Sequence, residues 1–132
     1  MLLEALIAAL MFAWAALAIQ SFQARASRTL ADAQLRAEAR HLAHATLAQM
    51  QAGNPASLYA DFDMRAGGAG YRAVVAQALR FPGVDATHNL PDVLITGGPS
   101  TASRAAAVTL QWRLPGDSTP HRYTAIAAVG AR

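Results

Sequence analysis

The sequence predicts an α+β protein in which a long N-terminal helix packs on a small antiparallel sheet. Residues 1–52 contain no glycine or proline and are rich in alanine and leucine, which favour a helix. Beyond residue 90, apolar and polar residues alternate with a period of two, which is typical of half-buried strands. The chain of 132 residues has room for one compact domain and little more.

The first part of the helix, residues 1–24, is predicted to be a transmembrane half. Residues 5–24 carry no charge, and residues 5–19 are apolar without interruption. A helix of about 20 such residues spans a hydrocarbon core of roughly 30 Å. We expect its large apolar side chains to face lipid or neighbouring helices: Leu6, Ile7, Leu10, Phe12, Trp14, Leu17 and Ile19.

The second part, residues 25–52, is predicted to be the amphipathic half of the same helix. It is polar on every side from Arg25 to Asp32, and an apolar stripe begins at Leu35. Gly53 and Asn54-Pro55 then end the helix. We expect the stripe to pack on the rest of the chain through Leu35, Leu42, Leu47 and Met50.

The remaining residues, 53–132, are predicted to form a small α+β head. Residues 53–70, with their run of glycines, are expected to be a flexible, irregular linker. A short helix is predicted over 71–79, and strands over 93–95, 108–114 and 123–129. Within the strands, Trp112 and Tyr123 are expected to be core residues.

The start of the chain carries a recognisable pattern. Residues 2–8 read LLEALIA, so that a short apolar lead is followed by Glu4 and then by an unbroken hydrophobic helix. This pattern resembles the start of mature type IV pilins and pseudopilins, and more narrowly that of minor pilins of the PilV type, which take part in pilus modification. Looser similarities follow in order at Met50-Gln51, at residues 71–83 and at residues 108–116.

The resemblance implies a role for Glu4. It matches the family's glutamate, which is thought to pair with the N-terminal amine of a neighbouring subunit during assembly. Family members are made with a basic leader ending in glycine, which a prepilin peptidase removes. Met1 would lie at about the second position of the mature family members. We therefore expect a leader upstream, and we expect either that the start codon was assigned too far downstream or that the sequence was trimmed.

The function expected from the resemblance is that of a minor pilin-like structural subunit in type IV pilus assembly or modification. The implied partners are other pilins or minor pilins, inner-membrane lipid and the prepilin peptidase. The implied location is the bacterial inner membrane, crossed once with the head in the periplasm, and the pilus after assembly. The positive-inside rule, applied to this sequence as it stands, favours the opposite orientation, because Arg25 and Arg28 follow the apolar segment and would place the head in the cytoplasm.

Several alternatives stay open at this point. A minor pseudopilin of a type II secretion system would have the same plan, and a pilin-type DNA-uptake receptor or an unrelated bitopic membrane protein would also fit the helix. Ala16-Leu17-Ala18 resembles a signal-peptide cleavage site, although no basic segment precedes the apolar stretch and an acid stands at position 4.

Composition argues against other classes of function. The net charge is +3, and the 11 basic residues, all arginine, are scattered along the sequence, so no nucleic-acid partner is expected. Glu38, His41 and His44 follow one another at helical spacing, but we interpret them as the polar face of the helix and expect no metal or cofactor. Asp61 and Asp63, and likewise His88 and His121, belong to no catalytic motif, so the chain is not expected to be an enzyme.

Overall fold

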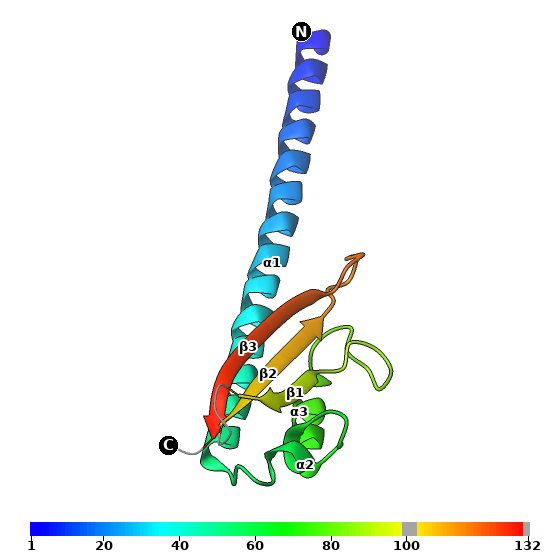
Figure 1. The fold of residues 1–132 in the computed structure, drawn as a ribbon. Helices are drawn as coiled ribbons and strands as arrows, with labels where there is room; N and C mark the ends of the chain where they lie inside the picture. Colours follow the sequence, from blue (N-terminus) through cyan, green and yellow to red (C-terminus); the bar gives the residue numbers. More distant parts are fainter. Residues whose placement is uncertain (99–102, 131–132) are drawn as a thin grey trace. The chain divides into compact units, whose positions relative to one another are not determined.

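The computed structural model describes residues 1–98 and 103–130 and confirms the α+β fold class. A long N-terminal helix is followed by two short helices and a three-stranded antiparallel sheet (Figure 1). Residues 1–34 and residues 35–132 form two compact units. The elements are α1 (Leu2–Ala52), α2 (Leu58–Phe62), α3 (Ala69–Ala78), β1 (Asp92–Gly97), β2 (Ser103–Trp112) and β3 (His121–Gly130).

The sheet has the order β1-β2-β3, so β2 is the central strand and β3 lies at an edge. Val108 of β2 pairs with Val93 of β1, and Trp112 of β2 pairs with His121 of β3. The β2–β3 hairpin is the one that the alternating pattern predicts. β2 begins five residues earlier than predicted, because its alanines at 105–107 show little contrast between the two faces, and it ends at Trp112, two residues before the predicted end at Leu114. β3 extends beyond the predicted 123–129 by His121, Arg122 and Gly130.

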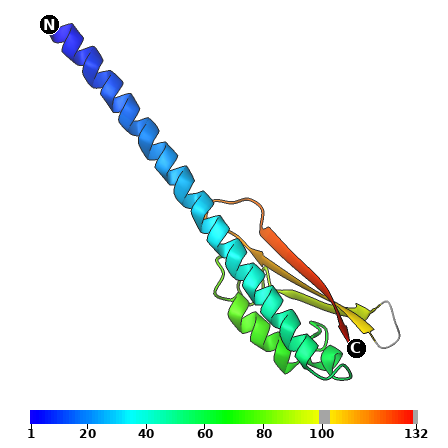
Figure 2. The ribbon, with the colours of Figure 1, turned by 90° about the vertical axis from the view of Figure 1, so that its left-hand side faces the viewer.

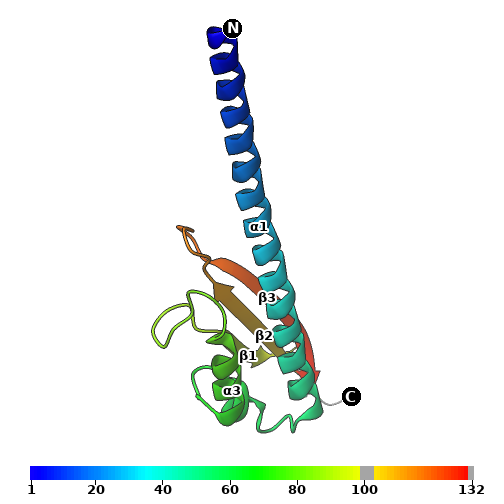
Figure 3. The ribbon, with the colours of Figure 1, turned by 180° about the vertical axis from the view of Figure 1, so that it is seen from behind.

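One face of the sheet is buried beneath the helices of the C-terminal unit. Figures 2 and 3 show the final turns of α1 and all of α3 on the same side of the sheet. From α1, Met50 is fully buried, and Leu42 and Leu47 are nearly so, while Leu35 is partly buried against the same core. Trp112 is fully buried, whereas Tyr123 is only half-buried at the margin of this core.

Residues 53–70 differ from the irregular linker that the sequence suggests. They include α2 and the first turn of α3, and Asp63 between these helices is fully buried. One carboxylate oxygen of Asp63 accepts the Arg65 N–H at 2.9 Å, and the other accepts the Ile95 N–H of β1 at 3.0 Å. Asp63 therefore ties this segment to the sheet, a structural role that depends on a distant residue.

The glycine run also has a packing role that the sequence alone does not reveal. A Cβ atom at Gly68 would collide with the Ala60 carbonyl oxygen and lie 2.6 Å from Asp61 Cα, and one at Gly70 would lie 2.6 Å from the Phe62 ring. Because real Cβ atoms do not approach other atoms so closely, only glycine lets α3 begin this near to α2.

Replacing Gly68 with alanine is expected to destabilise the C-terminal unit by about 3 kcal/mol or more, since the clashing atoms belong to the backbone and cannot turn aside. Gly97→Ala is the matched control, because a Cβ there meets nothing within 4 Å, and its effect should stay within about 0.5 kcal/mol. Urea unfolding followed by circular dichroism measures both. Equal stability of the two variants would contradict the packing role of Gly68.

Candidate functional surfaces

The most conspicuous surface of residues 1–34 is an uncovered apolar segment of α1. The seven large apolar side chains predicted for the membrane half have relative exposures between 51% and 79%. The most apolar stretch of the helix has a mean hydropathy of 2.3, and none of it is buried against the rest of the chain. By length and composition α1 can therefore cross a membrane, a property that signal sequences near an N-terminus share.

Glu4 is the acidic residue in the first turn of α1, and it is exposed. The unpaired N–H groups of that turn give the helix start a partial positive charge, which favours a carboxylate there. At the same time, Glu4 directly precedes the apolar segment, where an ionised carboxylate is costly unless it finds a partner. Glu4 is thus an exposed carboxylate at the margin of an uncovered apolar segment.

A second surface, on the C-terminal unit, is a groove between α1 and β3. It has a volume of about 660 Å³ and is hereafter called the basic groove. Three arginines and two histidines are among the residues that line it: Arg36, Ala37, Arg40, His41, His44, Arg122 and Tyr123. No carboxylate is among these residues, so the groove favours anionic ligands.

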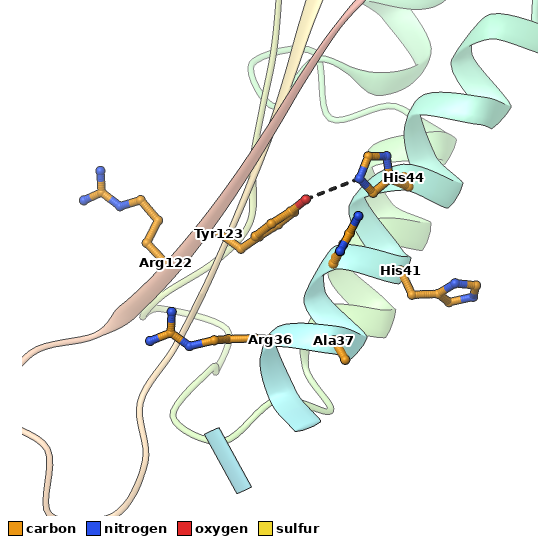
Figure 4. Close-up of a pocket in the computed structure, with 7 residues that line it drawn as sticks. Arg36, Ala37, His41, His44, Arg122 and Tyr123 are labelled. Carbon is orange, nitrogen blue, oxygen red and sulfur yellow. Dashed lines mark hydrogen bonds between the residues drawn. The ribbon is translucent and has the colours of Figure 1, made fainter. Parts of the chain in front are cut away.

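Two hydrogen bonds connect the walls of the basic groove. The Tyr123 hydroxyl and His44 Nε2 are 3.3 Å apart, and Figure 4 shows this bond between β3 and α1. Arg36 donates from Nη2 to His121 Nδ1 at 3.4 Å. Because a guanidinium can only donate, Nδ1 must be the unprotonated nitrogen of His121 in this arrangement, and Nε2 then donates to Asp117 at 2.7 Å.

The sequence could not reveal this concentration of charge. Arg36 and Arg40 lie on α1, whereas Arg122 lies on the last strand, and only the packing of β3 beside α1 brings them together. The interpretation of the arginines as scattered thus holds along the chain but not in space.

The histidines and carboxylates of the described residues do not gather into a metal site. His44 faces Tyr123, His41 points away from that ring in Figure 4, and no group of three metal-ligating side chains occurs within residues 1–98 and 103–130. His88 is exposed, and its Nδ1 lies 3.1 Å from Oδ1 of Asp85. Hydrogen bonds from the backbone and hydroxyl of Thr87, and then from His88, hold the pKa of the Asp85 carboxyl well below its usual range.

Comparison with known proteins gave no match to this chain among family models, curated proteins or solved structures.

Proposed function

We propose that this protein is a minor pilin-like structural subunit that takes part in the assembly or modification of a type IV pilus. The observation that carries the proposal is the uncovered apolar surface of α1, with Glu4 in the first turn of the same helix. Such a surface is stable only in lipid or among other apolar helices, which are the two environments of a pilin before and after assembly.

In this proposal, residues 5–24 anchor the chain in the bacterial inner membrane and residues 35–132 fold in the periplasm. After a prepilin peptidase has exposed the N-terminal amine, the same apolar residues pack against the helices of other pilins. The pattern of α1 supports this division, since residues 5–24 carry no charge, the helix becomes polar from Arg25, and it buries a stripe only from Leu35 onward.

Glu4 would set the register between subunits. In surroundings of low dielectric constant, an isolated carboxylate and an isolated ammonium group are both strongly disfavoured, and pairing them relieves both penalties. A single acid at the start of an otherwise apolar segment therefore selects one axial position of the neighbouring helix.

Glu4→Ala is expected to lower the amount of this protein in sheared filaments by at least about tenfold, because removing one partner of a buried ion pair leaves the other charge unpaired. Glu38→Ala is the matched control, since Glu38 is an exposed carboxylate further along the same helix. Both variants should be expressed from the native gene and quantified by immunoblot in membrane and filament fractions.

The expected pattern is selective. Glu4→Ala should stay in the membrane fraction at the wild-type level and be lost from filaments, while Glu38→Ala is present in both. If Glu4→Ala enters filaments as efficiently as the wild type, Glu4 has no role in register.

A further inference from the structure

The two edges of the sheet differ in how their backbone groups are satisfied. At the β1 edge, the Met64 N–H donates to the Val93 carbonyl at 2.9 Å, and the Asp63 carboxylate accepts the Ile95 N–H at 3.0 Å. The segment after α2 therefore covers this edge. From Arg122 to Val129 of β3, by contrast, the described structure contains no backbone hydrogen bond other than those to β2.

β3 also lacks the sequence features that usually protect an edge strand from pairing with another strand. It is ten residues long and contains no proline, lysine or acidic residue, and its charged side chains are confined to one end. Ile126, on the face turned away from the core, is 72% exposed. Long apolar edges of this kind accept an additional strand, because the row of free N–H and C=O groups is already in an extended geometry.

The basic groove lies against the start of this open edge, where Arg122 and Tyr123 are the residues of β3 that line it. A strand paired with β3 would place alternate side chains over the groove, near Arg36 and Arg40 of α1. Since the lining contains three arginines and no carboxylate, acidic side chains at those alternate positions would be attracted and basic ones repelled.

We infer that β3 and the basic groove together bind an extended acidic segment of a partner protein, which adds to the sheet as a fourth strand. Backbone hydrogen bonds to β3 give the segment its direction and register, and its carboxylates select it by charge. The inference concerns the unit of residues 35–132 and does not rest on the proposed pilus function.

A peptide fits this surface better than a single-stranded nucleic acid, although both are anionic. Nucleic-acid strands are held by stacking of bases on aromatic rings, and among the described residues that line the groove Tyr123 is the single phenylalanine, tyrosine or tryptophan. The free backbone groups of residues 122–129, in turn, have their natural complement in another peptide backbone.

The test uses the full chain in detergent micelles and a fluorescein-labelled peptide of five Thr-Glu repeats, with binding followed by fluorescence anisotropy. We expect saturable binding that weakens as salt is added. A Thr-Lys peptide of the same length should not bind. Two further Thr-Glu peptides, N-methylated either on the threonines or on the glutamates, test the pairing without altering the protein. One of them should bind at least tenfold more weakly, because its methyl groups face β3.

Substitutions in the protein test the groove. Arg40→Glu combined with Arg122→Glu should weaken binding at least tenfold. Arg72→Glu, an exposed arginine on α3 outside the groove, is the matched control and should change it less than twofold. Circular dichroism establishes that the variants are folded.

The inference is overturned if the Thr-Glu peptide does not bind, if both N-methylated peptides bind as well as the parent, or if Arg72→Glu weakens binding as much as the double substitution. Tighter binding of a ten-nucleotide single-stranded DNA than of the peptide would overturn the assignment of the partner as a protein.

Discussion

Trp112→Ala is expected to lower the free energy of unfolding of the C-terminal unit by about 3–5 kcal/mol. The indole is fully buried at the end of β2, with its ring centroid 6.2 Å from that of Phe81 and 5.8 Å from that of His121, on which it stacks. Domains of this size are stable by only about 5–15 kcal/mol. Loss of the indole would therefore remove much of the stability and leave a cavity that the strand pair cannot close.

Two further variants separate packing from other effects of substitution. Trp112→Phe keeps an aromatic ring and removes an indole N–H that is buried without a hydrogen-bond partner among the described residues. Its cost should thus be only about 1 kcal/mol. Ile126→Ala removes an exposed apolar side chain from the opposite face of the sheet and should cost less than about 1 kcal/mol.

Urea unfolding in micelles, followed by the strand signal in circular dichroism, measures all three variants. The ranking matters more than any single value. A Trp112→Ala effect no larger than that of Ile126→Ala would mean that the indole does not anchor the core.

The parts of the fold that the sequence predicts are those determined by local periodicity. The absence of helix breakers before Gly53 defines α1, and the alternation around Val108 and Trp112 defines the buried face of β2. These patterns depend on residues a few positions apart, so a single sequence is enough to recognise them.

The parts that could not be predicted depend on contacts between distant residues. From the sequence alone, Asp63 is interpreted as a loop carboxylate. Its structural role becomes clear only from its hydrogen bond to the N–H of Ile95, 32 residues further along the chain. Gly68 reads as a flexible position until the Ala60 carbonyl is found beside it. The basic groove likewise requires that β3 lie next to α1, which no local pattern specifies.

Membrane insertion of α1 provides the second large effect. Ala15→Arg is expected to lower the equilibrium constant for insertion by about 100-fold, because an arginine near the centre of a membrane-spanning helix costs about 2.5–3.5 kcal/mol. Ala15 lies inside the apolar segment and is exposed. Since arginine is itself a good helix former, the substitution changes polarity while leaving helix propensity nearly unchanged.

Ala26→Arg is a closely matched control. Ala26 is also an exposed alanine of α1, about three helical turns further along and on nearly the same face, but it lies beyond the uncharged segment. The two variants add the same charge to the same helix and differ only in position. Alkaline extraction of membranes should leave the wild type and Ala26→Arg in the pellet and release Ala15→Arg.

A periplasmic reporter fused after the last residue extends the measurement to orientation. In the proposed topology the reporter is active in the wild type and in Ala26→Arg, and inactive in Ala15→Arg. Retention of Ala15→Arg in the membrane at the wild-type level would show that residues 5–24 do not cross the bilayer. The uncovered apolar side chains of α1 would then have to be buried against protein alone, since their exposure to water is not sustainable in a chain with so large an apolar surface.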